Sequence, residues 1–329
     1  MILYAMLALL AASFKNQTNY YSNHKGGQIM VEGIHHISAF TKSAADNHYF
    51  YTEILGLRLV KNTVNQQNTQ MRHLFYGDYQ GNPGTLLTFF ELKKVGQAVK
   101  NNNYFSSVTL KVPRGSLPYW ETRLTDYAIP LDYNSCKQVL DFKDNDSLSL
   151  SLMEVNESIA LENATHHSDI PVNKQIIGIG EISLRVEQPD ETVSFLTDYL
   201  GLSPSHAIGQ LAIKKDSSFT TVKASNQTAV SRMGRGSIDH IAYSVDSFTE
   251  LDQLQKTAKQ HQLAIELYAD RGYFQSLYLL EPNGLRIEIA TNKPGFTLDE
   301  PLDELGERFS LPPFLETKRS EIEANLEGF

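Results

Sequence analysis

The alternation of hydrophobic and polar positions follows the same course in two segments of the chain. One begins at Gly33 and reads GIHHISAFTKSAADNHYFYTEILGLRLV, and the other begins at Gly178 and reads GIGEISLRVEQPDETVSFLTDYLGLSPS. They align without a gap at an offset of 145 residues. In each, alternating apolar residues predict a strand, and apolar residues at helical spacing up to Leu-Gly-Leu predict a helix that ends at a glycine. The chain therefore contains an internal repeat that opens with a strand and a helix.

Strand patterns continue after the first predicted helix. MRHLFYGDY, a Gly-Asn-Pro-Gly turn at 81–84 and TLLTFFEL at 85–92 indicate further strands, so that one unit has the order β-α-β-β-β. Two more units begin with SSVTLKV at 106–112 and IDHIAYSV at 238–245. The last one ends in a clear hairpin, with SLYLL at 276–280, a Glu-Pro-Asn-Gly turn and LRIEIAT at 285–291. The pattern thus predicts four such units.

We therefore predict an α+β protein whose four β-α-β-β-β modules form two pseudo-symmetric domains, each a curved sheet shaped like a half-barrel. The length of 329 residues fits two domains. Residues 31–156 are the predicted first half with modules one and two, and 175–292 the second half with modules three and four. Residues 157–174 are the predicted linker, and 293–329 a C-terminal wrap that is interrupted by prolines and ends in a helix from Glu316.

Residues 1–29 do not share this patterning. Their apolar run, MILYAMLALLAA, is shorter than the roughly 18 to 20 residues that span a bilayer, and the first positive charge follows it at Lys15, unlike a signal peptide. We predict an N-terminal extension outside the fold, either disordered or absent from a native protein that begins at Met30. No membrane association is expected.

Composition and charge narrow the function. The chain has 29 Lys and Arg against 38 Asp and Glu, a net charge of -9, which disfavours a nucleic-acid partner. The single cysteine, Cys136, excludes an internal disulfide and a CxxC pair, and we predict that it packs in the interior. This cysteine usage favours a reducing compartment, and therefore the cytoplasm.

Three residues in the first and last modules form a candidate metal site. His36 lies in the opening strand of module one, His240 in the opening strand of module four and Glu288 in its closing strand. Two histidines and one carboxylate are the ligands of a facial triad, which suits non-haem Fe(II) or Mn(II). Alternation also lets Tyr278 and Glu288 point into one cavity across the last hairpin.

The equivalent positions in the other modules lack this set. Module two has Ser107 and Ser151 where module four has its histidine and glutamate, and module one has Thr88 at the glutamate position. Because only modules one and four together supply three ligands, we predict that these two pack against each other. Module three has Glu181 where module one has its histidine; we expect a solvated charge there, with a carboxylate in a different pairing as the alternative.

Several segments together resemble the vicinal oxygen chelate superfamily (glyoxalase, bleomycin resistance and extradiol dioxygenase proteins), and within it the ring-cleaving dioxygenases of the hydroquinone 1,2-dioxygenase type. They are GIHHIS at 33–38, GNPGTLLTFF at 81–90, IDHIAYSV at 238–245, RGYFQSLYLLEPNGLRIEIAT at 271–291 and LPPFLETKR at 311–319. The resemblance implies the fold of glyoxalase and dihydroxybiphenyl dioxygenase. It also implies metal ligands and active-site residues, namely His36, His240 and Glu288 as ligands, and His35, Arg271 and Tyr278 around them. One departure is Asp239, where that type of enzyme tends to have a histidine.

The roles of the surrounding residues have alternatives. His35 precedes a ligand in a strand and should face the opposite side unless the strand is distorted, so that packing is its alternative role. Arg271 could stabilise a substrate anion, or it could form a salt bridge with Asp270 or Glu281. Tyr278 could donate a hydrogen bond to a reacting oxygen, or it could be a core aromatic.

The function we expect is a non-haem Fe(II) dioxygenase, with Mn(II) as the alternative ion, that cleaves a hydroquinone or catechol-like ring with O2 in cytoplasmic quinone detoxification. A homo-oligomer is compatible with the sequence. One alternative is a glyoxalase-like isomerase or thiol transferase, which would need a fourth protein ligand for which Thr88 is unsuited. The other is a metal-free protein that sequesters an aromatic compound and has no use for the triad.

Overall fold

Sixteen strands form two eight-stranded sheets in the computed structural model, which describes residues 30–136, 138–167, 169–213 and 217–326. The expectation for residues 1–29 lies outside the described residues. The first sheet has the order β14-β15-β16-β13-β1-β4-β3-β2. Its strands are β1 (Ile34–Thr41), β2 (Arg58–Asn65), β3 (Asn68–Gly77), β4 (Leu86–Glu91), β13 (Ile238–Val245), β14 (Ala264–Asp270), β15 (Phe274–Leu280) and β16 (Arg286–Pro294).

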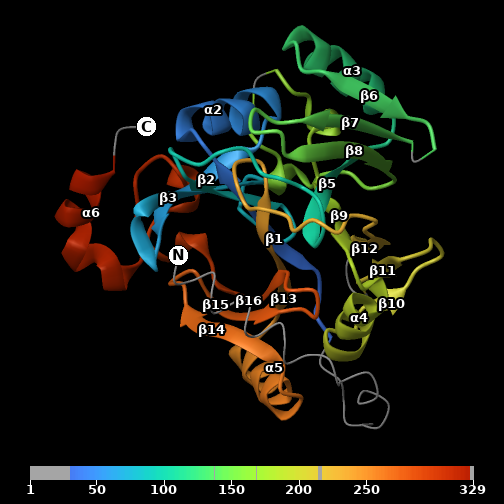
Figure 1. Ribbon diagram of the computed structural model, residues 1–329. Helices are drawn as coiled ribbons and strands as arrows, with labels where there is room; N and C mark the ends of the chain where they lie inside the picture. Colours follow the sequence, from blue (N-terminus) through green and yellow to red (C-terminus); the bar gives the residue numbers. More distant parts are fainter. Residues whose placement is uncertain (1–29, 137, 168, 214–216, 327–329) are drawn as a thin grey trace.

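The second sheet repeats this arrangement, with the order β10-β11-β12-β9-β5-β8-β7-β6. Its strands are β5 (Tyr104–Pro113), β6 (Leu131–Asn134), β7 (Val139–Lys143), β8 (Ser149–Val155), β9 (Gly178–Val186), β10 (Ser203–Pro204), β11 (Gln210–Ala212) and β12 (Phe219–Ala224). Figure 1 shows the two curved sheets meeting along β1, β5 and β9.

One helix follows the first strand of each module, so the four β-α-β-β-β modules and the α+β class are confirmed. The helices are α2 (Ala44–His48) continued by the π-helical turn η1 (Tyr49–Ile54), α3 (Leu117–Asp126), α4 (Pro189–Ser194) continued by η4 (Phe195–Tyr199), and α5 (Phe248–Gln260). In modules one and three the predicted glycines, Gly56 and Gly201, end the helix with positive φ angles of 71° and 77°. Glycine adopts this conformation without the steric cost of a side chain.

Strand pairing joins modules one and four in the first sheet and modules two and three in the second. The prediction that modules one and four pack against each other is therefore confirmed. Each sheet takes one module from each half of the chain, so the strand pairing runs across the predicted division into 31–156 and 175–292. That division, with its linker at 157–174, stays a prediction. The linker contains two 3-10 turns, η2 (Leu161–Asn163) and η3 (Val172–Lys174).

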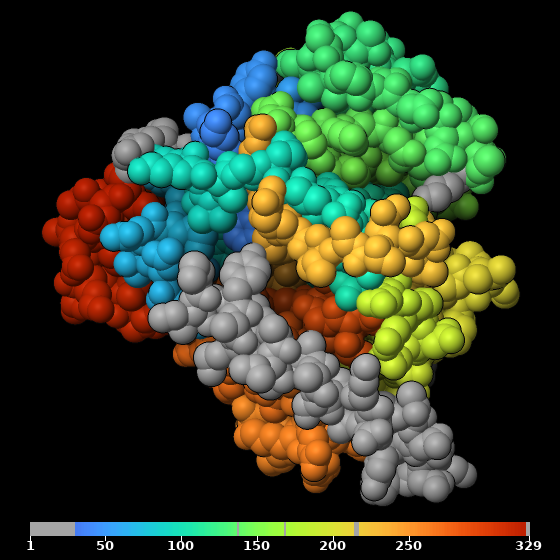
Figure 2. All heavy atoms as spheres, in the orientation of Figure 1, coloured from blue at the N-terminus to red at the C-terminus, as the bar shows by residue number. Residues whose placement is uncertain are grey.

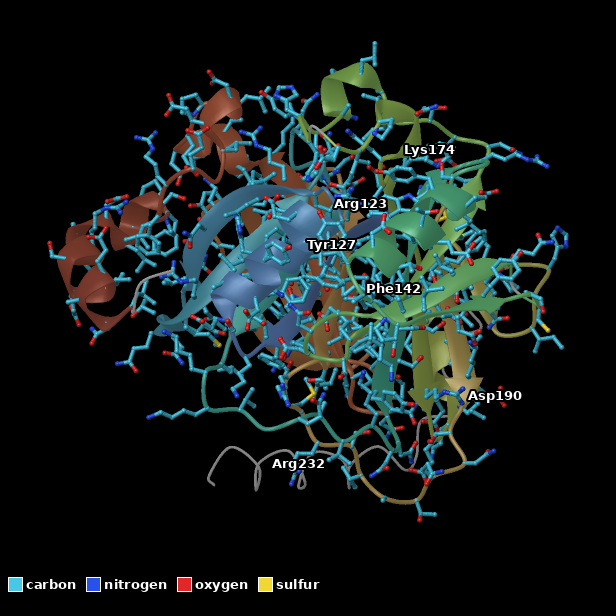
Figure 3. All side chains as sticks on the ribbon, turned by 90° about the horizontal axis from the view of Figure 1, so that it is seen from above. Arg123, Tyr127, Phe142, Lys174, Asp190 and Arg232 are labelled. Carbon is cyan, nitrogen blue, oxygen red and sulfur yellow. The ribbon has the colours of Figure 1, made fainter. Side chains whose placement is uncertain are left out.

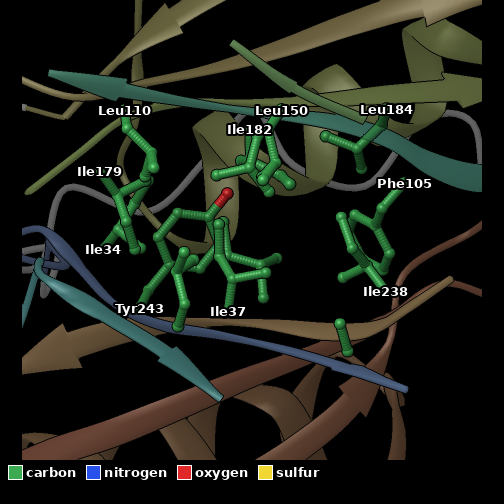
Figure 4. Packing of buried hydrophobic residues seen from close by; sticks show 14 of the residues in the cluster. Ile34, Ile37, Phe105, Leu110, Leu150, Ile179, Ile182, Leu184, Ile238 and Tyr243 are labelled. Carbon is green, nitrogen blue, oxygen red and sulfur yellow. The ribbon is translucent and has the colours of Figure 1, made fainter. Parts of the chain in front are cut away.

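The main hydrophobic core lies between the two sheets. Figure 4 shows Ile34, Ile37 and Tyr243 of the first sheet facing Leu110 and Ile182 of the second. The side chains of α5 that are buried belong to the same core as alternate residues of β15 and β16. Because successive side chains of a strand point to opposite faces, the other residues of these strands point to the far face of the first sheet, which we call the site face.

Contacts between modules hold the two sheets in place. The guanidinium of Arg123 on α3 donates to the backbone carbonyls of Glu53 and Ile54 at 2.7 and 2.8 Å, which ties module two to the end of η1 in module one (Figure 3). The segments that lead into β5 and β13 run side by side on the face shown in Figure 2, with Val99 bridged to Arg232.

The C-terminal segment closes one end of the site face. It comprises η5 (Phe296–Leu298), η6 (Leu302–Glu304), η7 (Pro313–Lys318) and α6 (Arg319–Asn325), a helix that begins three residues after Glu316. The boundary of a separate C-terminal wrap at 293 stays a prediction. Phe296 and Leu305 enter a second hydrophobic cluster with Phe75, Phe274 and other residues of the site face.

A buried lysine anchors this segment. Lys61 on β2 is fully buried, and its Nζ donates to Glu300 and, at 2.7 Å, to Oδ1 of Asp299. The same Nζ lies 4.7 Å from the centre of the Tyr273 ring. The C-terminal wrap is thus held by a buried ion pair as well as by apolar contacts.

Two smaller expectations concern the cysteine and the membrane. Cys136 is exposed in the turn between β6 and β7, so the prediction that it packs in the interior is wrong. This hairpin is at the edge of the second sheet, where little protein covers it. None of the helices in the described residues has both the length and the apolar composition to cross a bilayer.

Candidate metal centre

The three predicted ligands lie together on the site face. The Nε2 atoms of His36 and His240 are 3.2 Å apart, and Oε2 of Glu288 lies 3.3 Å from the first and 2.9 Å from the second. Their strands β1, β13 and β16 are adjacent in the sheet, and Tyr278 lies directly opposite Glu288 in β15, as alternation in the hairpin predicts. Among the described residues this is the only group of three or more potential protein ligands that could hold a metal ion.

The donor set fits a divalent cation. All three side chains are buried, with exposed fractions of 2%, 3% and 0% for His36, His240 and Glu288. Oε1 of Glu288 accepts a hydrogen bond from Ser276, whereas Oε2 faces the Nε2 atoms of both histidines. A cation between this oxygen and the two imidazole nitrogens would satisfy all three buried atoms. Two nitrogens and one oxygen suit Fe(II) or Mn(II).

The electrostatics agree with this arrangement. Burial alone would raise the pKa of Glu288, but the imidazoles of His36 and His240 hold it well below its usual value. Burial lowers the pKa of His36 in spite of the nearby carboxylate. The site therefore offers an ionised carboxylate next to an imidazole that burial keeps neutral, which is the protonation state that metal binding requires.

His35 is also on the site side of its strand. The pairing of β1 with β13 shifts register between Ile34 and His36, so the strand is distorted at His35. Nδ1 of His35 lies 2.9 Å from Nδ1 of His36, and its ring centre is 5.0 Å from that of Phe274. Burial and the adjacent His36 lower the pKa of His35 to about 3. His35 is therefore a neutral imidazole in contact with a predicted ligand, and it also hydrogen-bonds to the backbone of Thr291.

The other predicted ligand, His240, contacts a carboxylate. Nδ1 of His240 lies 2.7 Å from Oδ2 of Asp239, and Nη1 of Arg286 donates to both Asp239 oxygens at 3.0 and 3.1 Å. Burial alone would raise the pKa of Asp239, but the hydrogen bond from His240 and the charge of Arg286 hold it below its usual value. Burial alone would lower the pKa of His240, and its bonds to two carboxylates raise it.

Arg271 and Tyr278 form a pair at the same site. Nε of Arg271, from the loop between β14 and β15, donates to the Tyr278 hydroxyl at 3.1 Å, and its guanidinium lies 4.8 Å from the centre of that ring. Nη1 of Arg271 also lies 3.4 Å from Oε1 of Gln66. Burial and the charge of Glu288 raise the pKa of Tyr278, so it is a neutral phenol. The Asp270 carboxylate accepts a hydrogen bond from the backbone N–H of Gly272. Among the described residues, Asp270 forms no ion pair with the Arg271 guanidinium.

Three polar residues of the site face were not predicted as a group. The hydroxyl of Thr88 on β4 lies 2.7 Å from the Ser38 hydroxyl and 2.9 Å from Nε2 of His73 on β3. The ring of His73 lies between Phe75 and Phe90, 4.1 Å from each. Alternation from His36 to Ser38 and from Phe75 to His73 is the signal that could have found two of them. Thr88 is neutral, and its hydroxyl already bonds to two side chains, so it is not a charged fourth ligand for a metal ion.

In the second sheet, the positions equivalent to the candidate metal ligands are occupied by other residues. Ser107 pairs with Ser183, as His240 pairs with Ser38 in the first sheet. Glu181 is half-buried and accepts from the Ser183 hydroxyl at 2.8 Å and from Gln210 at 3.1 Å. It lies in the other sheet and is bound locally, so it is neither a free solvated charge nor a carboxylate of the metal group.

Comparisons with known proteins agree with the fold. The profile of the Glyoxalase/Bleomycin resistance protein/Dioxygenase superfamily matches residues 178–289. The chain is 36% identical over 310 residues to the Bacillus subtilis (strain 168) protein named "Putative ring-cleaving dioxygenase MhqA", covering 90% of this chain and 98% of that protein. It is 26% identical over 310 residues to the chlorohydroquinone/hydroquinone 1,2-dioxygenase of Sphingobium indicum, covering 89% and 95%.

A solved structure extends the likeness to three dimensions. The crystal structure of a dioxygenase from Bacillus subtilis subsp. subtilis str. 168, titled "putative", superposes with a TM-score of 0.85 at 31% identity, covering 92% of this chain and 98% of that one. Sequence and fold therefore agree over nearly the whole length. The chain belongs to the glyoxalase/bleomycin resistance protein/dioxygenase superfamily, among relatives that are named as ring-cleaving dioxygenases.

Proposed function

We propose that this protein is a non-haem Fe(II)-dependent dioxygenase that cleaves the ring of a hydroquinone or catechol-like aromatic compound with O2. The observation that carries the proposal is the buried group of two imidazole nitrogens and one carboxylate oxygen within 3.3 Å of one another. Three protein ligands leave positions open on an octahedral ion, which ring cleavage requires. The names of the relatives point to the same reaction.

The proposed site residues have separate roles in metal binding, substrate binding and proton donation. His36, His240 and Glu288 would hold Fe(II), which supplies a centre where a substrate oxygen and O2 can be brought together. Arg271 offers a positive charge for the substrate anion, and its contacts with Tyr278 and Gln66 orient it.

Tyr278 is suited to donate a proton or a hydrogen bond. Its oxygen accepts from Arg271, and its side chain also has a hydrogen bond with Ser276, in whose place a substrate oxygen would accept from the Tyr278 hydroxyl. The raised pKa keeps this hydroxyl protonated at neutral pH. The rings of Phe274 and Phe90, with centres 5.5 Å from His36 and 6.4 Å from His240, provide apolar surface for an aromatic compound and exclude water.

The place of Thr88 argues against an isomerase or thiol transferase with four protein ligands. Thr88 is neutral and is bonded to Ser38 and His73. The buried group of His36, His240 and Glu288, for which a metal-free sequestering protein has no use, argues against that alternative. We propose detoxification of quinone-type compounds in the cytoplasm as the setting.

The test is anaerobic reconstitution with Fe(II), followed by O2 uptake with methylhydroquinone, hydroquinone and catechol. Wild type is compared with His240→Ala and with Ser107→Ala, the matched position in the second sheet. We expect uptake in wild type and Ser107→Ala, and none in His240→Ala. A wild type that binds metal but consumes no O2 with any of the three compounds would favour the isomerase or transferase. A wild type that binds no metal would favour the sequestering protein.

A further inference from the structure

We infer that Asp239 is a positioning residue for the metal ligand His240, and that the Asp239–Arg286 pair makes the two histidine ligands unequal. Asp239 stands where the resembled enzymes tend to have a histidine. The inference rests on the metal site of the proposed function, but it does not depend on the ring-cleaving reaction.

The contact between Asp239 and His240 sets the tautomer of the ligand. Nδ1 of His240 lies 2.7 Å from a carboxylate oxygen that can only accept, so the ring proton is on Nδ1. An imidazole that binds a cation through one nitrogen has one ring proton, so with a cation bound this proton would stay on Nδ1 and Nε2 would supply its lone pair. That atom is the one that lies 2.9 Å from Oε2 of Glu288 and 3.2 Å from Nε2 of His36. Asp239 thus turns the lone pair of His240 toward the other ligand atoms.

Arg286 holds the carboxylate in place. It lies directly opposite His240 in β16, and its Nη1 reaches both oxygens of Asp239. Its Nε donates to Glu266 at 2.7 Å on the other side. The chain of contacts from Glu266 through Arg286 and Asp239 reaches the imidazole of His240 at Nδ1, the ring nitrogen that does not face Glu288 and His36.

The other histidine ligand has a different partner. Nδ1 of His36 lies 2.9 Å from Nδ1 of His35, which is a neutral imidazole and is itself bonded to the backbone of Thr291. A hydrogen bond to a carboxylate is stronger than one to a neutral acceptor, and it increases the electron density on the far nitrogen of the ring. His240 is therefore the stronger donor of the two, and the loss of Asp239 weakens one side of the site selectively.

The experiment measures Mn(II) affinity, because Mn(II) suits the same donor atoms and its binding can be measured without ring-cleaving activity. Wild type, Asp239→Ala and Asp239→Asn are titrated with Mn(II). The matched control is Glu181→Gln, a carboxylate at the His36-equivalent position of the second sheet. We expect Asp239→Ala to bind Mn(II) about 10 to 100 times more weakly, Asp239→Asn to lie between it and wild type because the amide oxygen still accepts, and Glu181→Gln to match wild type.

A second readout separates positioning from folding. Nitrogen-15 NMR of the metal-free protein, at a pH high enough for the His240 imidazole to be neutral, reports which ring nitrogen carries the proton: Nδ1 in wild type and Asp239→Asn, and a mixture of tautomers in Asp239→Ala. Wild-type Mn(II) affinity in Asp239→Ala, or a proton on Nε2 in wild type, would overturn the inference. So would a wild type that binds neither Mn(II) nor Fe(II), which would overturn the proposed function as well. Metal binding without O2 uptake would leave the inference standing and remove only the ring-cleaving activity.

Discussion

The hydroxyl of Ser276 donates to Oε1 of Glu288 at 2.5 Å, so that only Oε2 of this carboxylate faces the two histidines. The bond keeps the glutamate in the orientation of a single-oxygen ligand. Ser276→Ala should therefore lower Mn(II) affinity about 10-fold or more. Equilibrium dialysis is the measurement, with Ser107→Ala as the control. Equal affinities for the two variants would show that the carboxylate needs no such restraint.

Tyr278→Phe separates the proton-donor role from packing. The change removes one hydroxyl and keeps the ring that lies 5.6 Å from His240. We expect Mn(II) affinity to stay as in wild type and kcat for O2 uptake to fall about 10²- to 10⁴-fold, the usual contribution of a positioned acid or base. An unchanged kcat would mean that Tyr278 is a core aromatic.

Lys61→Met tests the anchor of the C-terminal wrap. The change leaves the buried Glu300 and its neighbour Asp299 without their shared cation. We expect the free energy of unfolding in urea to fall by about 3 to 5 kcal/mol, the usual cost of breaking a buried ion pair. Lys259→Met on the exposed face of α5 is the control, with an expected change of at most about 0.5 kcal/mol. A similar small loss for Lys61→Met would show that apolar contacts alone hold the wrap.

Asp144 should make stability depend on pH. Burial raises the pKa of Asp144 to about 6, although Leu148 and Tyr51 donate hydrogen bonds to its oxygens. The pKa of Asp144 in the unfolded chain is about 4, so between about pH 4 and pH 6 the folded state holds a proton that the unfolded state has lost. This group therefore contributes stability at pH 4 that is lost as the pH rises to 6.

The Asp144→Asn variant has no carboxyl group at this position and therefore cannot take up or lose this proton. The free energy of unfolding of wild type relative to Asp144→Asn should therefore decrease from pH 4 to pH 7, by up to about 3 kcal/mol. Urea unfolding at five pH values is the measurement. A difference that is constant with pH, or that grows in favour of wild type as the pH rises, would contradict the raised pKa.

Much of the fold followed from periodicity. The repeat at an offset of 145 residues predicted the modules, because strand alternation and a glycine-terminated helix are local patterns that tertiary packing did not override. The three candidate ligands followed from comparing equivalent positions among modules. His36 and His240 were informative because the other modules carry glutamate and serine at those places.

Other parts of the site depend on contacts that a single sequence does not encode locally. The register shift beside His35 arises from how β1 meets β13, and alternation alone placed this residue on the opposite face. His73 and Thr88 come together through strands β3 and β4, and Lys61 meets its carboxylates only after the C-terminal segment has wrapped across β2. Asp239 was visible as a departure from the family, but its contact with His240 required the structure.

The pairing of modules one and four has a consequence for biosynthesis. His36 and His240 are 204 residues apart, and the strands of the second sheet lie entirely between them in the chain. A ribosome that has released β5 to β12 has delivered every strand of the second sheet, but only half of the first. A chain that stops before Glu288 carries at most two of the three candidate ligands. The complete group of His36, His240 and Glu288 can therefore assemble only in a translation product that is nearly full length.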